Sequence, residues 1–325
     1  MISSRPLVSV VIPTRNRPIL VLRAVRSALQ QTLREIEVIV VIDGEPGRET
    51  ADAVARLKED RVRCIVLQEA VGGSEARNIG IRDARSPWIA LLDDDDEWLS
   101  AKLELQLEAA LRQAGKRQLV VTCQHLFRAE GEVDVVRPRR LPRPGEPPSE
   151  FMFDYLCYFQ TSTFFCSKEI MLRIPFTKGL PFFQDIDWFL RAMRDPASEL
   201  VVVPQPLSIY HAPENRISVT SGLKWKARVD WGHANRHLMS KRGYSRFIVG
   251  SCVGPAVWDR AGLRGLWRLF YECAIVGSPT PLLLLLLFGM YSLRPALRKK
   301  LRDRFFLRRA DAQAAPEQAQ DAEAA

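Results

Sequence analysis

Four consecutive aspartates, Asp93 to Asp96, directly follow the apolar run WIALL at 88–92. The apolar run predicts a buried strand, so the aspartates lie where that strand leaves the core. Carboxylates packed this closely repel one another, and a positive partner is needed to offset the repulsion. Clustered carboxylate oxygens are the ligands that Mg²⁺ and Mn²⁺ prefer. We therefore expect a divalent metal site here, with a solvated acidic loop as the alternative.

The elements that position this cluster follow from the apolar pattern along the chain. Continuous apolar runs predict strands at 7–12, 38–42, 61–67, 88–92 and 119–123. Helical spacing of apolar residues predicts helices at 18–31, 48–59 and 75–84, and a further helix capped by Ser100. Apolar strands that alternate with helices are typical of an α/β fold, with a mostly parallel sheet and helices on both faces.

Ligands of such α/β sheets bind at the carboxyl ends of the strands. That rule brings together the polar loops at 13–17 and 43–47 and the aspartates at 93–96. A site with Asp43 at one edge and several carboxylates at the other suits a phosphorylated ligand bridged by a divalent metal.

Three segments between residues 8 and 98 carry a family resemblance. VSVVIPTRNRPILVLRAVRSALQQT, EIEVIVVIDG and GGSEARNIGIRDARSPWIALLDDDDEW resemble, in order and spacing, the family-2 glycosyltransferases. The resemblance implies a Rossmann-like GT-A fold and an inverting transfer of a sugar from a nucleotide-diphosphate donor to an acceptor hydroxyl. It also implies a DXD motif and a Mn²⁺ or Mg²⁺ cofactor.

The resemblance implies a donor-binding set formed by Thr14, Arg15, Asp43, Arg77, Asp93 and Asp95. Thr14 and Arg15 would line the pocket for the base, and Asp43 would hydrogen-bond that base. Arg77 would help hold the diphosphate. Asp93 and Asp95 would be the two DXD aspartates, reaching the ribose and the metal. The chain departs from the family at Ile42, where an acidic residue is usual, and at Arg15, which is often Tyr.

Direct displacement at the anomeric carbon requires a base for the acceptor proton. In the family a carboxylate supplies it, from a Glu-Asp pair before a helix that ends in Leu-Arg. PFFQDIDWFLRAMRD at 181–195 is similar, with Asp185 in the place of the base and Gln184 in the place of the usual Glu. The alternative is that Asp185 only caps the helix. His211 matches a histidine that some relatives have in this region, so it is a tentative third metal ligand.

The domain organisation follows from the same patterns. Residues 1–220 are expected to form the glycosyltransferase domain, with a donor-binding half at 1–125 and an acceptor and base half at 126–220. A helical region at 221–309 should follow, and then a disordered tail at 310–325. The Pro- and Arg-rich stretch 137–150 is either an acceptor loop or a plain surface loop.

The C-terminal region contains an apolar segment, 273–293, that Pro279 and Pro281 interrupt. Spanning a membrane takes about 20 uninterrupted apolar residues. We therefore expect a helix that lies on the membrane or packs internally, with a single span as the alternative. The stretch 294–309 has eight Lys or Arg residues and one Asp, a net charge of +7, which favours an anionic membrane surface.

The overall charge of +9 is concentrated in that stretch, so a nucleic-acid partner is not expected. Six scattered cysteines without metal-site spacing are typical of reduced thiols in the cytoplasm, and the N-terminus lacks the order of a signal peptide. We predict an inverting, metal-dependent glycosyltransferase on the inner face of the cell membrane, acting on a glycan or lipid-linked acceptor. A non-catalytic nucleotide-sugar-binding scaffold is one alternative, suggested by Ile42 and Gln184. A nucleotidyltransferase is another, although its phosphate loop is missing.

Overall fold

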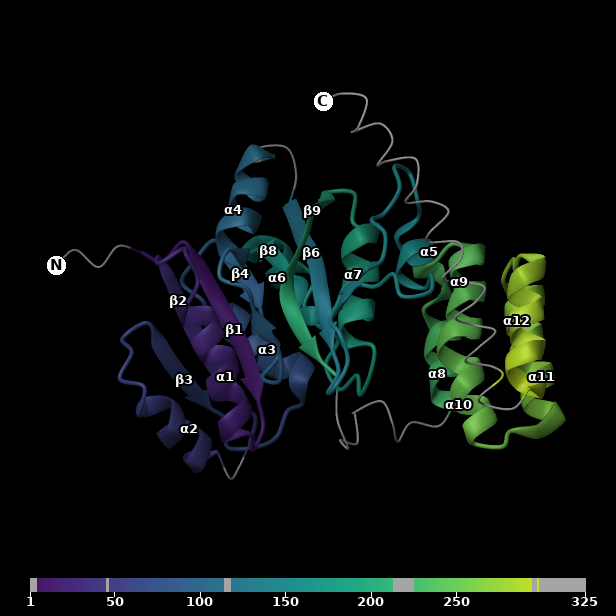
Figure 1. Ribbon diagram of the computed structural model, residues 1–325, viewed down its shortest axis with the longest axis horizontal. Coiled ribbons are helices and arrows are strands. Elements are labelled where there is room, and N and C mark those ends of the chain that lie inside the picture. The colour runs from purple at the N-terminus through teal and green to yellow at the C-terminus, as the bar shows by residue number, and fades with distance from the viewer. Residues whose placement is uncertain (1–4, 45–46, 114–117, 213–224, 294–296, 298–325) are drawn as a thin grey trace. The chain divides into compact units, whose positions relative to one another are not determined.

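The computed structural model describes residues 5–44, 47–113, 118–212, 225–293 and 297. The chain forms two compact units (Figure 1). Unit 1 comprises 1–138 and 159–221, and unit 2 comprises 139–158 and 222–325. Residues 139–158, which the sequence assigned to the acceptor half, therefore cluster with the C-terminal helices. The predicted tail at 310–325 and all but one residue of the basic stretch lie outside the described residues.

Within the described residues, unit 1 is built on a nine-stranded sheet with the order β3-β2-β1-β4-β8-β6-β9-β5, and β7 pairs with β6. The strands are β1 Val8–Thr14, β2 Ile36–Ile42, β3 Val62–Val66, β4 Trp88–Leu91, β5 Glu97–Trp98, β6 Gln118–Arg128, β7 Val135–Arg137, β8 Phe165–Ser167 and β9 Ser198–His211. The strands β3, β2, β1 and β4 are parallel, and β8 runs antiparallel to β4 and β6. The carboxyl ends of β1, β2 and β4 therefore share one edge of the sheet.

Helices cover both faces of this sheet, as predicted. They are α1 Pro18–Leu29, α2 Arg48–Ala55, α3 Gly73–Asp83, α4 Lys102–Arg112, α6 Lys168–Arg173 and α7 Gln184–Arg194, with the 3₁₀ turn η1 at Thr161–Thr163. The apolar sides of α1, α2 and α4 share one core cluster with β1 and β2. On the other face α3 lies so close that a β carbon at Gly80 would be 2.5 Å from Val11.

One local prediction in this unit is wrong. The helix α4 begins at Lys102 after Ala101, and no side chain caps it, so Ser100 is not its cap. Packing of Leu103, Leu107 and Ala110 into the core stabilises the helix instead.

Unit 2 is helical in its described part. Its elements are α5 Pro148–Met152, α8 Trp225–Ala234, η2 Arg236–Leu238, α9 Lys241–Phe247, the π-helical turn η3 Ile248–Cys252, α10 Val253–Trp258, α11 Gly262–Phe270, the π-helical turn η4 Tyr271–Val276 and α12 Pro281–Ser292. Phe247 lies at the centre, packed against Phe153, Trp231 and Tyr244. A β carbon at Gly232 would be 2.1 Å from the Phe247 ring, so glycine permits this packing.

The apolar segment 273–293 is divided between two elements. The turn η4 ends at Val276, and α12 begins at Pro281 after Thr280, whose hydroxyl accepts a hydrogen bond from the Leu283 N–H at 3.3 Å. Among the described residues, every helix falls short of the length and apolar character that crossing a membrane requires.

Candidate functional site

The predicted polar loops meet at the carboxyl edge of the parallel strands. The Asp43 N–H donates to the Thr14 carbonyl at 2.8 Å, which joins the ends of β1 and β2. The Leu92 N–H donates to the Val11 carbonyl at 3.1 Å, which brings the segment after β4 alongside β1. The loops after these three strands therefore surround one site, as the sequence predicted.

The four aspartates alternate between two environments. Asp94 and Asp96 are 6% and 2% exposed. Asp94 accepts a hydrogen bond from the Thr14 hydroxyl at 2.7 Å, and Asp96 accepts one from the Ser162 hydroxyl at 2.6 Å. The side chains of Asp93 and Asp95 are 29% and 34% exposed. Asp93 and Asp95, which were predicted to form the DXD motif, thus remain accessible, while Asp94 and Asp96 hold the loop in place.

Burial dominates the electrostatics of the two inner aspartates. Burial and, to a smaller extent, the neighbouring Asp95 carboxylate raise the pKa of Asp94 to about 6, against the opposing effects of Thr14 and Arg17. Burial likewise raises the pKa of Asp96 well above its ordinary value, with Asp93 and Asp95 adding to the effect. Negative charge at this edge is therefore costly without positive partners.

Arginines from α1, the loop before it and α3 supply positive charge. Arg17 Nη1 lies 3.0 Å from Asp94 Oδ1 and 3.2 Å from Asp95 Oδ2. Arg77 Nη2 lies 2.5 Å from Asp93 Oδ1. Arg23 donates to the main-chain carbonyl of Asp95 and lies 3.5 Å from Glu97.

Arg17 and Arg23 were not predicted, because a metal was expected to supply the positive charge. The run of four aspartates was itself the signal, since any nearby cation offsets the repulsion between the carboxylates. Arg15, predicted to line the base pocket, is exposed, and Arg17 two residues later makes the contacts with the aspartates.

Asp43 organises the glycine turn that precedes α3. Its two carboxylate oxygens accept hydrogen bonds from the N–H groups of Val71 at 2.6 Å and Gly72 at 3.0 Å. Gly72 has a φ of +83°, a conformation that other residues rarely adopt. Asp43 therefore fixes the start of α3, the helix that carries Arg77.

Arg77 joins the aspartates to the predicted base. While its Nη2 pairs with Asp93, its Nη1 donates to Gln184 Oε1 at 2.8 Å. Gln184 is the first residue of α7, and Asp185 follows it in the first turn. Arg77 therefore connects Asp93 to the start of α7, where the predicted base Asp185 lies.

Asp185 is partly buried, and burial raises the pKa of its carboxyl to about 6. A hydrogen bond from the Ile186 N–H, at 2.9 Å from Asp185 Oδ1, and the Arg77 charge oppose that shift, whereas the Asp93 charge adds to it. The residue at the N-cap of α7 is Phe183, so Asp185 is not the cap residue. A carboxylate with a pKa close to neutrality suits a general base.

His211 lies beside the acidic segment but contacts Glu97, and not Asp93 or Asp95. Its Nε2 is 2.7 Å from Glu97 Oε1, and burial lowers its pKa, with the Arg23 charge acting in the same direction. Among the residues that the structure describes, no group of three or more His, Cys, Asp or Glu side chains could hold a metal ion. Mg²⁺ commonly binds one or two carboxylates together with substrate phosphates, so Asp93 and Asp95 provide suitable oxygen ligands without a third protein ligand.

The fold and the site define a glycosyltransferase with a sheet of the GT-A type. Residues 9–179 match the family model described as Glycosyl transferase family 2. Because that match covers more than half of the chain, the protein belongs to glycosyl transferase family 2. The assignment confirms the predicted family and enzyme class and disfavours the nucleotidyltransferase alternative.

Two curated relatives illustrate the family. The amylovoran biosynthesis glycosyltransferase AmsB of Erwinia amylovora is 27% identical over 239 residues, which cover 72% of this chain and 79% of that protein. The UDP-Glc:alpha-D-GlcNAc-diphosphoundecaprenol beta-1,3-glucosyltransferase WfaP of Escherichia coli is 35% identical over 101 residues, which cover 31% of this chain and 40% of that protein.

Two solved structures share the fold. TarS 1–349 of S. aureus in complex with UDP-GlcNAc has a TM-score of 0.59 at 15% identity, covering 82% of this chain and 81% of that one. The mannosyltransferase PcManGT of Pyrobaculum calidifontis, in complex with GDP-Man and Mn²⁺, has a TM-score of 0.51 at 17% identity, covering 95% and 87%. At this identity the likeness shows the fold alone, and it confirms the predicted α/β architecture of the GT-A type.

Proposed function

We propose that this glycosyltransferase moves a sugar, with inversion, from a nucleotide-diphosphate donor to a hydroxyl of a lipid-linked or polysaccharide acceptor. The observation that carries the proposal is the bridge that Arg77 makes between Asp93 and Gln184. Through this bridge the donor-binding edge and the predicted base Asp185 form one continuous site.

In this mechanism Asp185 accepts the proton of the acceptor hydroxyl as its oxygen attacks the anomeric carbon. The bond between that carbon and the diphosphate oxygen breaks, and the nucleotide diphosphate leaves. The Asp185 carboxyl, with a pKa of about 6, is ionised at neutral pH and ready to take the proton. Arg77, fixed on both sides, orients the first DXD aspartate relative to that base.

The donor is expected at the edge formed by Thr14, Asp43 and the DXD aspartates, with Arg15 and Arg77 beside it. Asp93 and Asp95 would hold Mg²⁺ or Mn²⁺, and His211 would reach the ion only after leaving Glu97. When bound, the ion supplies positive charge opposite the departing diphosphate. The Mn²⁺ in the mannosyltransferase structure is consistent with this cofactor.

The acceptor class is inferred from the relatives. The name of WfaP describes a transferase that acts on a diphosphoundecaprenol-linked sugar, and AmsB is named for amylovoran biosynthesis. A lipid-linked acceptor would require this enzyme to work at the inner face of the cell membrane, as a peripheral or monotopic protein. The basic stretch 294–309 supports attraction to anionic lipids.

The test is binding and hydrolysis of a panel of nucleotide sugars with Mn²⁺, using wild type, Asp95→Ala and Asp185→Asn. We expect Asp95→Ala to lose metal-dependent donor binding. We expect Asp185→Asn to retain donor binding and to lose turnover by a factor of about 10²–10⁴, the range for removing a general base.

Asp52→Asn is the matched control, because Asp52 is an exposed aspartate on α2. It should behave like wild type in both assays. If no nucleotide sugar binds to wild type, or if Asp185→Asn turns over at the wild-type rate, the proposed mechanism is wrong.

A further inference from the structure

An exposed apolar stripe runs along α11 and η4 in unit 2. Leu263, Trp267, Tyr271 and Ile275 recur at every fourth position, and they are 83%, 71%, 51% and 65% exposed. Residues four apart share one face of a helix. The stripe is therefore a continuous apolar surface in contact with solvent, where a soluble helix normally carries polar residues.

The opposite side of the same helix is fixed in the core of unit 2. Leu269 and Cys273 are completely buried, and the buried Glu272 accepts a hydrogen bond from the Tyr244 hydroxyl at 2.6 Å. Rotating the helix to hide the stripe would break that bond and expose the core residues. The outward direction of the stripe is thus a consequence of the packing.

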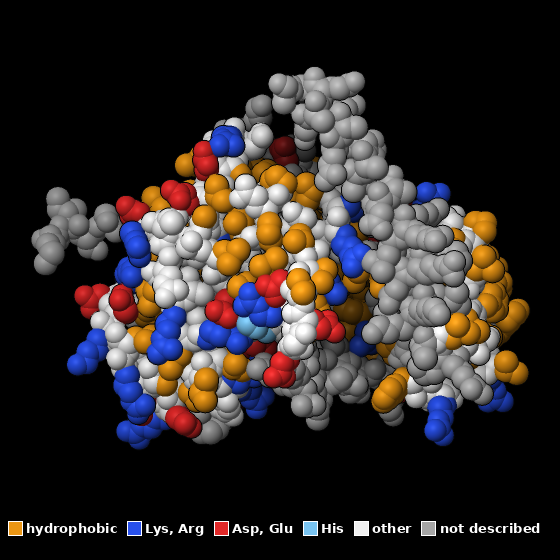
Figure 2. Space-filling model, in the orientation of Figure 1, with side chains coloured by type: hydrophobic (Ala, Val, Ile, Leu, Met, Phe, Trp, Pro, Cys, Tyr) orange, Lys and Arg blue, Asp and Glu red, His pale blue; other side chains and the backbone are white. Residues whose placement is uncertain are grey.

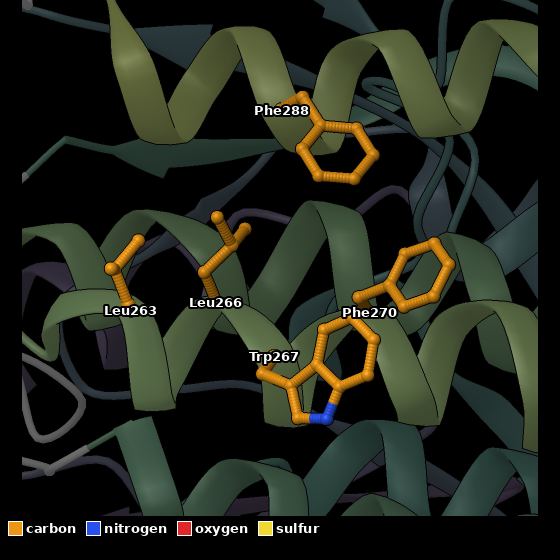
Figure 3. Close-up of a pocket in the computed structure, with 5 residues that line it drawn as sticks. All are labelled: Leu263, Leu266, Trp267, Phe270 and Phe288. Atoms are coloured by element: carbon orange, nitrogen blue, oxygen red, sulfur yellow. The ribbon is translucent and has the colours of Figure 1, made fainter.

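A groove lies beside the stripe, between α11 and α12 (Figure 3). It has a cavity volume of about 330 Å³ and is lined by Leu263, Leu266, Trp267, Phe270 and Phe288. The Trp267 and Phe270 rings stack at 5.5 Å, and Phe270 faces Phe288 at 5.9 Å. The groove is wholly apolar in its side chains and suits a hydrocarbon chain.

The neighbouring helix α12 extends the apolar surface. Its sequence PLLLLLLFGMYS has no charged residue, and Leu285 and Phe288 are exposed. Figure 2 shows hydrophobic side chains gathered over the part of unit 2 that contains α11 and α12. An exposed apolar patch of this kind marks a binding surface for a protein or a membrane.

Basic residues border the other side of α11 and identify the occupant. A second pocket is lined by Lys226, Arg264 and Arg268, with Trp225 and Asp259 among its other lining residues. Arg268 is paired with Asp230 at 2.6 Å, whereas Arg264 is exposed. An apolar face that carries Trp267 and several Leu and Phe side chains, and that is flanked by Lys and Arg, is the pattern of a helix that lies in the interface of an anionic bilayer.

We propose that α11, η4 and α12 form a membrane-docking face, which seats the stripe at the boundary between lipid headgroups and acyl chains. One acyl chain occupies the groove of Leu263, Leu266, Trp267, Phe270 and Phe288, and anionic headgroups meet Lys226, Arg264 and Arg268. The docking face would give the enzyme access to a lipid-linked acceptor, and in this respect the inference rests on the proposed function. Its test requires neither donor nor acceptor.

The first experiment is co-sedimentation of the full chain with phosphatidylcholine vesicles that contain or lack phosphatidylglycerol. We expect binding that requires phosphatidylglycerol and weakens with added salt. Acyl chains brominated near the headgroup should quench the fluorescence of Trp267, which is exposed on the stripe, whereas Trp258, the other exposed tryptophan of the described chain, lies on α10 outside the proposed face. Trp267→Phe should retain binding and lose most of that quenching.

The second experiment compares variants. Leu263→Ser combined with Trp267→Ser should weaken vesicle binding by about a hundredfold, roughly tenfold for each apolar side chain removed from the interface. Leu111→Ser combined with Val133→Ser, two exposed apolar residues of unit 1, is the matched control and should bind like wild type. Arg264→Gln should reduce the preference for phosphatidylglycerol, and Arg56→Gln, at an exposed arginine directly after α2, should not.

Three results would overturn the proposal. In the first, wild type does not bind to vesicles that contain phosphatidylglycerol. In the second, the control pair of variants loses as much vesicle binding as the stripe variant. In the third, inorganic phosphate abolishes vesicle binding completely and the stripe variants bind like wild type. A change of oligomeric state in the stripe variant with unchanged vesicle binding would assign the face to a second copy of the chain instead. Donor binding without vesicles should be the same in the stripe variant and wild type, so failure of this inference is separate from failure of the proposed function.

Discussion

The buried lysine of α4 makes a quantitative prediction about stability. Lys102 is completely buried, its Nζ lies 2.5 Å from Gln106 Oε1, and it sits 4.2 Å from the centre of the Trp98 ring. Burial lowers the pKa of this ammonium from 10.5 to about 8. Because the unfolded chain binds this proton more tightly, stability rises with pH between the two pKa values.

The magnitude follows from that difference. At about 1.4 kcal/mol per pKa unit, the burial of Lys102 lowers the free energy of unfolding by about 3 kcal/mol near pH 7, where the buried group is charged. Near pH 10 the buried group is neutral, and the cost falls to about 1 kcal/mol. Lys102→Met removes the charge and keeps the length of the side chain. The difference in free energy of unfolding between Lys102→Met and wild type should therefore shift by about 2 kcal/mol in favour of wild type over that interval.

Urea unfolding of both proteins at several pH values, followed by circular dichroism, measures this difference. Comparing the two proteins at each pH removes the contribution of all other titrating groups. The charge-dependent part of the contacts with Gln106 and Trp98 is already contained in the lowered pKa, so losing the contacts of the neutral amine adds only an offset that is the same at every pH. A difference that stays constant across that range would show that the folded-state pKa is not lowered, and would refute the reasoning.

Two further predictions concern α3. Gly80→Ala should lower the free energy of unfolding by about 1–3 kcal/mol, because the new β carbon would lie 2.5 Å from Val11. Gly254→Ala, where a β carbon meets no atom within 4 Å, is the control and should not lose stability; equal losses would contradict the packing argument. Arg77→Gln should reduce turnover by about 10²–10³, as for other lost charge contacts in active sites, while donor binding changes less. Steady-state kinetics with the best donor checks this, and an unchanged turnover would show that the bridge between Asp93 and Gln184 is dispensable.

The central strands of the parallel half of the sheet were predictable because they are mainly apolar. Residues 8–14, 36–42 and 88–91 are nearly all buried and have only a few polar residues, such as Ser9 and Glu37, so their position in the middle of the sheet follows from composition. The antiparallel strand β8 was not predictable. It has three residues, and its place between β4 and β6 depends on long-range pairing such as Ala90 with Phe165.

The start of α4 shows a different limit. A serine before a helical pattern favours an N-cap, but the helix begins two residues later, without a side-chain cap. Tertiary packing of its apolar face outweighs a cap that is worth about 1 kcal/mol.

In the site, the sequence identified which strands end near one another but not how charges pair there. Asp43 was expected to bind the donor base, and the structure also gives it two backbone hydrogen bonds to the glycine turn. The link from Arg77 to Gln184 spans 107 positions in the chain, and no local pattern encodes it. Pairing of this kind depends on the packing of α3 beside α7 and becomes visible only in three dimensions.

The run of four aspartates can be understood from its alternation. Asp93 to Asp96 form a turn, in which the Asp96 N–H donates to the Asp93 carbonyl at 3.2 Å, and this turn places alternate side chains in different environments. Asp94 and Asp96 point inward, where Thr14, Arg17 and Ser162 satisfy their oxygens. A loop held by two buried carboxylates presents the other two at fixed positions. Since Arg17 and Arg77 already balance those outer carboxylates, a bound cation would compete with guanidinium groups, and its affinity should rise when Arg17 is replaced by Gln.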